Sequence, residues 1–163
     1  MADLVVAFDS DTSEDAMKGK YLLFPIGENT YGIPIRYVVD IIEVQKVTSV
    51  PDLPNYMKGI VNLRGTIVPV VDIRTRFHRE EIPYTDRTCL IVVGMEGMKA
   101  GLVVDTVSEV LPIDDNQVMT PPQHGEYSNQ FVFGIGKTPS GPKLLLDCHR
   151  LFGESSDAEV EGV

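Results

Sequence analysis

Histidine is the residue most often used for metal binding and for proton transfer near neutral pH, and this chain has three of them. His78, His124 and His149 are far apart, and neither a His-x-x-x-His nor a Cys-x-x-Cys spacing occurs. Such spacings bring two ligands of a zinc site together. The histidines are therefore more typical of surface or helix-end positions, and we expect neither a metal nor another cofactor.

Motifs for nucleotide binding and for nucleophilic catalysis are also missing. Gly134-Ile135-Gly136 begins like a dinucleotide-binding loop, but the third glycine and the long helix that would follow it are absent. No Gly-x-x-x-x-Gly-Lys-Ser/Thr loop and no Gly-x-Ser-x-Gly elbow occurs in the chain. The sequence therefore offers no phosphate-binding loop and no activated serine.

Aspartates are the remaining candidates for acid–base chemistry. Asp114 and Asp115 are followed by Asn116, which fits a solvated turn and helix start better than a pair of catalytic carboxylates. Asp72 and Asp147 each follow a predicted strand directly, where aspartate is a preferred helix N-cap. With every candidate explained by structure, we expect a protein that is not an enzyme.

The formal net charge of -10 comes mostly from the two ends of the chain. Residues 1–19 carry five acids and one lysine, and residues 154–163 carry four acids and no base. We expect these segments to be flexible acidic tails around a folded domain at residues 20–153. That domain has a net charge of only -2, which argues against nucleic acid or an anionic membrane as the main partner.

The distribution of apolar residues predicts a cytoplasmic protein. No apolar run approaches the length of about 18 residues that is needed to span a bilayer. No basic start followed by an apolar block suggests export. Cys89 and Cys148 lie among apolar neighbours, where a reduced thiol behaves as a small hydrophobic group. We therefore expect no direct membrane insertion.

Short apolar runs, rich in β-branched residues and bounded by Gly, Pro, Asn and Asp, predict an all-β fold with short helices. About ten strands are expected, the clearest at 21–26, 30–35, 39–44, 66–71, 88–95, 99–104, 109–112, 130–135 and 143–146. Short helical segments are predicted at 36–38, 54–58, 72–77 and 147–152. Gly27-Glu28-Asn29 and Glu96-Gly97 supply turns for two hairpins.

The most informative feature is the similarity between two halves of the chain, which appears in two alignments. In the first alignment, Gly32, Ile35, Val38, Asp40, Ile41 and Ile42 match Gly101, Val104, Val107, Glu109, Val110 and Leu111 at a constant spacing. In the second alignment, Gly59, Ile60, Val70, Val71, Asp72 and Phe77 match Gly134, Ile135, Leu145, Leu146, Asp147 and Phe152, again at a constant spacing. Because both sets occur in the same order, two homologous halves are the better interpretation.

We place the halves at residues 20–77 and 87–152, joined by a polar connector at 78–86. Each half would contain about five strands and a short helix. A unit of about 60 residues has a marginal core by itself, so the halves must bury surface against each other. Some exchange of strands between them is compatible with this pattern, and their junction would form a groove.

Asn62, Arg64 and Gly65 interrupt the otherwise apolar stretch at residues 59–72. As a simple turn, Asn-Leu-Arg-Gly would place glycine at a positive φ and Arg64 in water. The second half keeps the apolar positions but has Lys137-Thr138-Pro139-Ser140 in the equivalent place. Because the repeated fold does not itself need an arginine there, the asymmetry favours a functional role for Arg64.

Three segments carry a longer pattern. They are Tyr31-Gly32-Ile33-x-Ile35, Lys58-Gly59-Ile60-Val61-Asn62-Leu63-Arg64-Gly65-x-Ile67-Val68-Pro69-Val70-Val71-Asp72-x-Arg74-x-x-Phe77 and Gly101-Leu102-Val103-Val104-Asp105-x-Val107-x-Glu109-Val110-Leu111. This pattern resembles the CheW family of bacterial chemotaxis coupling proteins, from about residue 20 to residue 152. The resemblance implies two intertwined SH3-like five-stranded barrels with a hydrophobic core between them, in agreement with the duplication.

The resemblance also implies a function. A member of this family is a non-enzymatic adaptor that joins the cytoplasmic tip of methyl-accepting chemoreceptors to the regulatory domain of the histidine kinase CheA. That domain shares the fold and alternates with CheW in rings, so self-association in rings is also implied. The expected location is the cytoplasm, with recruitment to membrane-associated receptor arrays.

Carried over by position, the resemblance implies a receptor-binding groove. Its predicted residues are Val38, Asp40, Ile41, Gly59, Asn62, Arg64, Val104 and Val107. The family pairs an acid at the position of Asp40 with the arginine at position 64, so we expect Asp40 and Arg64 to be in contact. The valines and Ile41 are equally compatible with ordinary core packing.

Two alternatives remain. A fragment of a CheA-type kinase would share the fold, although ATP-binding and phosphotransfer sequences are absent from this chain. A small hydrolase would need Asp72, Asp147 or His149 to cluster, although the two aspartates belong to different halves. A coupling protein with an attached receiver domain is not expected, because 163 residues leave no room for a second domain of roughly 100 residues.

Overall fold

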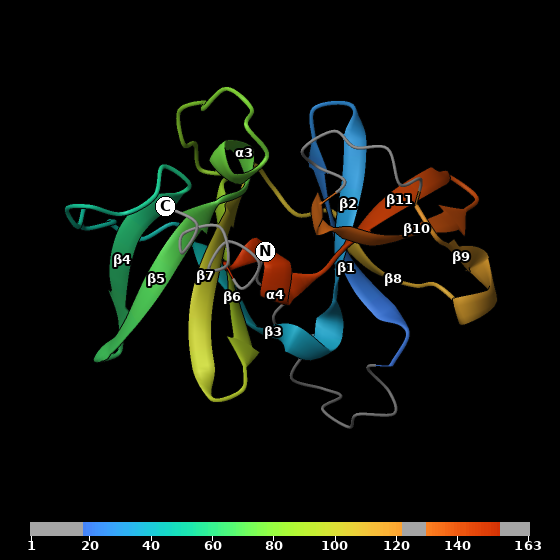
Figure 1. Ribbon diagram of the computed structural model, residues 1–163, viewed down its shortest axis with the longest axis horizontal. Coiled ribbons are helices and arrows are strands. Elements are labelled where there is room, and N and C mark those ends of the chain that lie inside the picture. Colours follow the sequence, from blue (N-terminus) through green and yellow to red (C-terminus); the bar gives the residue numbers. More distant parts are fainter. Residues whose placement is uncertain (1–17, 122–129, 154–163) are drawn as a thin grey trace.

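The strands form two β-sheets, which lie side by side in Figure 1. The computed structural model describes residues 18–121 and 130–153. Sheet A contains β1 (Lys20–Ile26), β2 (Asn29–Pro34), β8 (Glu109–Pro112), β9 (Val118–Met119), β10 (Val132–Thr138) and β11 (Gly141–Leu146). Sheet B contains β3 (Val38–Glu43), β4 (Met57–Leu63), β5 (Thr66–Asp72), β6 (Cys89–Met95) and β7 (Met98–Val104). The short helices are η1 (Ile35–Tyr37), α3 (Ile73–Arg76), η2 (Asp115–Gln117) and α4 (Cys148–Leu151).

Some predictions from the sequence concern residues outside 18–121 and 130–153. The predicted acidic tails fall almost entirely on residues 1–17 and 154–163, and His124 belongs to the segment 122–129, so these predictions lie outside the described residues. Within residues 18–121 and 130–153, no helix combines the length and the apolar character that a membrane crossing requires.

The two sheets share one plan. Their strand orders are β8-β1-β2-β11-β10-β9 in sheet A and β3-β6-β7-β5-β4 in sheet B. All paired strands are antiparallel except β2 with β11 and β5 with β7, which are parallel. The first alignment, of Gly32 with Gly101, places β1 and β2 on β6 and β7, and the second, of Gly59 with Gly134, places β4 and β5 on β10 and β11. With β3 matched to β8, the five-strand orders are identical, and β9 is an addition to sheet A.

Each sheet combines strands from both halves of the chain. The β1–β2 hairpin of the first half lies in sheet A beside β8 and β11, and the β6–β7 hairpin of the second half lies in sheet B beside β3 and β5. The strand orders agree with the predicted repeats at residues 20–77 and 87–152, but each sheet is completed by a hairpin from the other repeat. Because this exchange is reciprocal, neither repeat can build its sheet alone.

The central strands β1 and β6 each have two apolar faces, because their side chains alternate in direction. In β1, Tyr21 and Leu23 pack in a cluster within sheet A, whereas Leu22, Phe24 and Ile26 pack in the core between the sheets. β6 shows the same alternation between a cluster within sheet B and the shared core. The helices α3 and α4 also bury apolar residues in the shared core. This largest cluster joins the two sheets into one unit.

The fold class and the helix caps are confirmed. Asp72 accepts a hydrogen bond from the Arg74 amide at 2.8 Å, and Asp147 accepts one from the His149 amide at 2.9 Å. These contacts begin α3 and α4, as expected for aspartate N-caps. The Glu96-Gly97 turn also forms, with successive φ angles of 51° and 80°.

The predicted helical segment at residues 54–58 is wrong. These residues form turns and the beginning of β4, in which Met57 pairs with Val71. The Tyr56 carbonyl accepts a hydrogen bond from the Asp72 amide at 3.1 Å. Pairing with β5 gives hydrogen-bond partners to backbone N–H and C=O groups that would lack them in an isolated helical turn. The strand β9 was not predicted, because two residues are too few to produce a periodic signal.

Candidate functional site

An open groove of about 370 Å³ lies at the end of sheet B that carries the β4–β5 turn. The strand β3 contributes Val39 and Asp40, and the β4–β5 hairpin contributes Asn62 and Arg64. Lys99 of β7 adds a second cation to the lining. Three predicted site residues, Asp40, Asn62 and Arg64, therefore come together on one surface.

The turn between β4 and β5 presents Arg64 to solvent. Leu63 pairs with Thr66, so that Arg64 and Gly65 are the two central residues of the turn. Their φ angles are 54° and 85°, a combination typical of a type I′ turn. The Asn62 side chain accepts a hydrogen bond from the Gly65 amide at 2.9 Å and stabilises this conformation. Arginine is unusual at a positive φ, which favours a reason other than folding for its presence.

The equivalent turn in sheet A is built differently. Thr138 pairs with Gly141, and the central residues are Pro139 and Ser140. Proline is restricted to a negative φ, so a type I′ turn is excluded here. Gly141 takes a φ of 116° instead, and its carbonyl accepts a hydrogen bond from the Thr138 hydroxyl at 2.7 Å. The duplicated fold thus accommodates two turn types, and it requires an arginine in neither.

The expected ion pair between Asp40 and Arg64 is not formed within the described residues, although both line the groove. Asp40 follows a register shift in β3, and its carboxylate accepts a hydrogen bond from the Ile41 amide at 2.9 Å. Arg64 is exposed on its turn. The groove therefore offers one carboxylate and the cations of Arg64 and Lys99 to a partner.

The apolar residues predicted for the site divide into two groups. Ile41 and Val104 are 1% and 0% exposed, so their side chains belong to the shared core and do not line the groove. Val38 and Val107 are half-buried and pack against the same core. Val38 follows the segment that leads from sheet A to sheet B, and Val107 lies in the segment that leads back to sheet A.

Gly59 has a structural role in the backbone. Its φ is 143°, and a Cβ atom there would lie 2.0 Å from the Thr48 carbonyl oxygen. Thr48 and Ile60 exchange two backbone hydrogen bonds, of 2.8 and 2.9 Å, at this crossing. The equivalent Gly134 lies at a similar register shift, where a Cβ would approach Val118 at 2.6 Å. Both repeats therefore need glycine where another chain segment crosses the bent strand.

Arg74 and Asp105 form an ion pair that was not predicted from the sequence. Arg74 Nη2 donates to Asp105 Oδ2 at 2.7 Å, and Arg74 Nε donates to Asp105 Oδ1 at 3.0 Å. The two side chains are only 17% and 24% exposed. Both residues are part of the quoted motif, but their separation of 31 residues gives no sign that they meet.

The connector after α3 is attached to the helix by side chains. The Tyr84 hydroxyl donates to Asp72 Oδ2 at 2.7 Å, and Arg74 Nη1 donates to the Glu80 carbonyl at 3.3 Å. Burial and the hydrogen bond to Asp72 raise the pKa of Tyr84 above its ordinary value. Asp72 is therefore both a helix cap and an anchor for the connector at residues 78–86.

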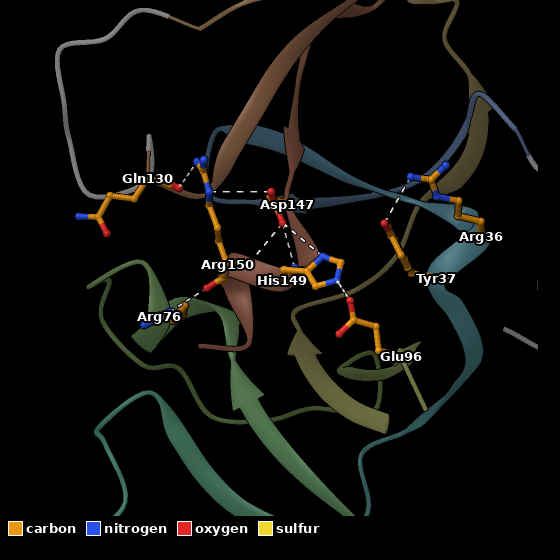
Figure 2. A network of polar contacts seen from close by, with 8 residues as sticks. All are labelled: Arg36, Tyr37, Arg76, Glu96, Gln130, Asp147, His149 and Arg150. Carbon is orange, nitrogen blue, oxygen red and sulfur yellow. Dashed lines mark hydrogen bonds and ion pairs between the residues drawn. The ribbon is translucent and has the colours of Figure 1, made fainter. Parts of the chain in front are cut away.

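The second helix, α4, lies in a separate polar network, which Figure 2 shows. His149 faces Glu96 of the β6–β7 turn at 3.6 Å, and its ring meets that of Tyr37 edge-on with centroids 5.9 Å apart. Arg76 is 7% exposed and donates to the carbonyls of Leu151 at 2.9 Å and Arg150 at 2.8 Å. These contacts link α3 to the end of α4 across the core.

Of the three residues named for a hydrolase, Asp147 and His149 approach each other, with 3.8 Å between Asp147 Oδ1 and His149 Nδ1. Asp72 and Asp147 are both engaged as helix caps, on different helices. Among the described residues, no group of three or more His, Cys, Asp and Glu side chains is arranged to hold a metal ion. Burial raises the pKa of the Cys148 thiol to about 12 and also raises that of Cys89. The polar groups are used for structure, and the groove remains the best candidate site.

Comparison with known proteins identifies the family. The CheW-like domain family matches residues 20–156, which is most of the chain. The chain belongs to the CheW family. Its relatives include the chemotaxis protein CheW of Klebsiella aerogenes, 32% identical over 145 residues, which are 88% of this chain and 87% of the relative. The chemotaxis protein CheW of Thermotoga maritima is 31% identical over 144 residues, which are 88% and 94% of the two chains.

A solved structure shares the fold as well. The scaffolding protein TtCheW from Thermoanaerobacter tengcongensis superimposes with a TM-score of 0.77 and 36% identity, covering 82% of this chain and 92% of that one. The CheW-like fold expected from the motifs is thereby confirmed. These relatives also support a chemotaxis scaffold or adaptor as the function of this chain, in preference to a fragment of a CheA-type kinase.

Proposed function

We propose that this chain is a non-catalytic adaptor that joins the cytoplasmic tip of methyl-accepting chemoreceptors to the regulatory domain of the histidine kinase CheA. The observation that carries the proposal is the β4–β5 turn, where Arg64 is exposed beside a groove of about 370 Å³. The equivalent turn of sheet A has Pro139 and Ser140, so the arginine is not required by the duplicated fold. Family membership supplies the chemotaxis context.

The receptor would bind as a helical hairpin that places apolar side chains in the site. Val38 and Val107 have apolar surface left at the edge of the shared core, and Arg64 and Lys99 provide charge at the groove. Ile41 and Val104 would hold the site in place from the core, and Gly59 would set the path of β4. Asn62 would act through its hydrogen bond to the turn.

The kinase regulatory domain would meet exposed ends of the sheets away from the β4–β5 turn. This arrangement leaves the receptor groove free for simultaneous binding and allows copies of the chain to take part in rings with the kinase. The adaptor would work in the cytoplasm and would be recruited to receptor arrays at the membrane through its partners. No insertion into the membrane is required for this role.

The test is the substitution Arg64→Glu, with capture of a receptor tip and of the CheA regulatory domain measured separately. We expect receptor affinity to fall at least about tenfold, because the reversed charge repels the group that Arg64 contacts. Regulatory-domain binding and thermal stability should stay unchanged. Lys137→Glu is the matched control, since it makes the same change of charge on the equivalent hairpin of sheet A. Undiminished receptor binding by the folded Arg64→Glu variant would remove Arg64 from the site.

A further inference from the structure

The chain crosses between the sheets twice. Residues 35–37 lead from β2 in sheet A to β3 in sheet B, and residues 105–108 lead from β7 in sheet B to β8 in sheet A. The first alignment of the two repeats relates these crossovers to each other. Val38 directly follows the first crossover and Val107 lies within the second; these half-buried residues of the proposed receptor site are equivalent in the alignment.

The second crossover, residues 105–108, is attached at both ends. At its start, the Asp105 carboxylate accepts two short hydrogen bonds from Arg74, of 2.7 and 3.0 Å. At its end, Ser108 donates to the Leu23 carbonyl from both its amide, at 2.9 Å, and its hydroxyl, at 3.1 Å. Val107 lies between these attachments. The position of its side chain is therefore set by its own packing against the shared core together with the contacts of its neighbours.

The Arg74–Asp105 contact has a geometry that can fix the start of the 105–108 crossover. A guanidinium that donates two parallel hydrogen bonds to a carboxylate restrains both distance and orientation, which a single point charge does not. The pair is shielded, with side-chain exposures of 17% and 24%, so water screens it less than a surface ion pair. Arg74 is itself held, because α3 starts at the Asp72 cap and Arg74 Nη1 also donates to the Glu80 carbonyl.

The first crossover cannot form the same pair, because neither equivalent position holds an acid. At the position of Arg74 the second repeat has His149, and at the position of Asp105 the first repeat has Arg36. Helix α4 instead meets this crossover through the His149 and Tyr37 rings, which approach edge-on with centroids 5.9 Å apart. The two crossovers therefore carry equivalent valines on differently restrained segments.

We infer that Arg74 and Asp105 are positioning residues, which hold the 105–108 crossover so that Val107 is presented to the receptor. This inference rests on the proposed function, since it assigns the pair a role in the same receptor site. It predicts a specific defect. Loss of the pair should weaken receptor binding through the position of Val107, without affecting partners that bind elsewhere on the molecule.

The experiment uses the full chain with Asp105→Asn, which removes the charge and preserves the size of the side chain. Three quantities are measured: affinity for a receptor tip hairpin, affinity for a CheA regulatory domain, and hydrogen–deuterium exchange of the amides in residues 105–108. We expect receptor affinity to fall about five- to twentyfold, exchange in the crossover to rise at least tenfold, and regulatory-domain affinity to stay within twofold.

Two control variants separate this result from other defects. Glu81→Gln breaks the ion pair of 2.9 Å between Lys58 and Glu81, which is more exposed, and should change none of the three quantities. Arg64→Glu should weaken receptor binding while exchange at residues 105–108 stays slow. If Asp105→Asn reduces both affinities together, Arg74→Lys, which keeps the charge but loses the paired geometry, repeats the test with a smaller disturbance.

The outcomes are distinct. If the unaltered chain does not bind the receptor tip, the proposed function fails and the exchange data alone report on the crossover. If the unaltered chain binds but Asp105→Asn binds equally well, the proposed function stands and the positioning role is overturned. Slow exchange at residues 105–108 in a weakly binding Asp105→Asn variant would also overturn it, because the crossover would then be held without the pair.

Discussion

The β4–β5 and β10–β11 hairpins occupy equivalent places in two sheets of the same strand order, and their differences separate folding from function. Both hairpins contain a glycine at a register shift, Gly59 in one and Gly134 in the other, and both are followed by an aspartate-capped helix. Only the β4–β5 hairpin has an exposed arginine in its turn, and there the Asn62 side chain accepts a hydrogen bond from the turn backbone. The features that both hairpins share serve the fold. The exposed arginine, which only the β4–β5 hairpin has, is available for a partner.

The largest expected effect tests whether the two glycines are equally necessary. Gly59→Ala should lower the free energy of unfolding by about 3 to 5 kcal/mol, because the new Cβ meets the Thr48 carbonyl in a backbone conformation with a φ of 143°. Gly134→Ala should cost about 1 to 2 kcal/mol, because its Cβ meets the Val118 side chain at an ordinary φ. Urea denaturation measures both values.

Gly65→Ala is the control for backbone strain without a clash. Its φ is 85°, but a Cβ atom there meets nothing within 4 Å, so the expected loss is about 1 kcal/mol. Equal losses for Gly59→Ala and Gly134→Ala would contradict the assignment of a backbone clash to the first repeat alone.

The next effect concerns the two helix caps. Asp72→Ala should lower the free energy of unfolding by about 2 to 3 kcal/mol, since the residue is 4% exposed and its carboxylate also accepts a hydrogen bond from the Tyr84 hydroxyl. Asp147→Ala should cost about 1 kcal/mol, because a more exposed carboxylate there serves the α4 cap. Thermal unfolding followed by circular dichroism gives the comparison. A larger loss for Asp147→Ala would show that the connector adds nothing to the Asp72 cap.

A smaller effect of opposite sign is expected at Tyr31, whose equivalent in the second repeat is Ala100. Tyr31 is 0% exposed, and its hydroxyl has no hydrogen-bond partner among the described residues. Tyr31→Phe should therefore raise the free energy of unfolding by about 1 kcal/mol, while the ring contact with Phe77, at 5.0 Å between centroids, is retained. Tyr37→Phe is the control and should change stability by less than about 0.5 kcal/mol. A loss of stability in Tyr31→Phe would indicate that its hydroxyl is satisfied in solution.

Much of the fold could be predicted from the sequence because it is repeated. The two alignments of the repeats place nearly every strand and both capped helices, since the same local pattern occurs twice. The segment 54–58 was predicted wrongly because its backbone partners are in β5, beyond the range of a local pattern. The full exchange of hairpins between the sheets likewise depends on pairings that a single sequence does not display.

The site could be predicted in part. Arg64 was found because one repeat departs from the other, which is visible in the sequence. Of the neighbours Asp40 and Ile41, only Asp40 lines the groove, because Ile41 is buried in the core. The Arg74–Asp105 pair was missed because its partners are 31 residues apart and lie on different elements. Long-range side-chain contacts of this kind follow from the topology, which must be known first.

The smallest effect gives the sharpest separation of the two hairpins. Arg64→Asn should raise the free energy of unfolding by about 0.5 kcal/mol, because asparagine tolerates the positive φ of a type I′ turn better than arginine does. The same variant should lose receptor binding, since it removes the exposed cation. Ser140→Asn, on the equivalent turn, should bring no such gain in stability, because Pro139 excludes that turn type. Urea denaturation and receptor capture measure the two properties. A protein that becomes more stable as it loses its partner would show that Arg64 is kept against the preference of the fold, whereas parallel losses of both would show that the arginine serves folding after all.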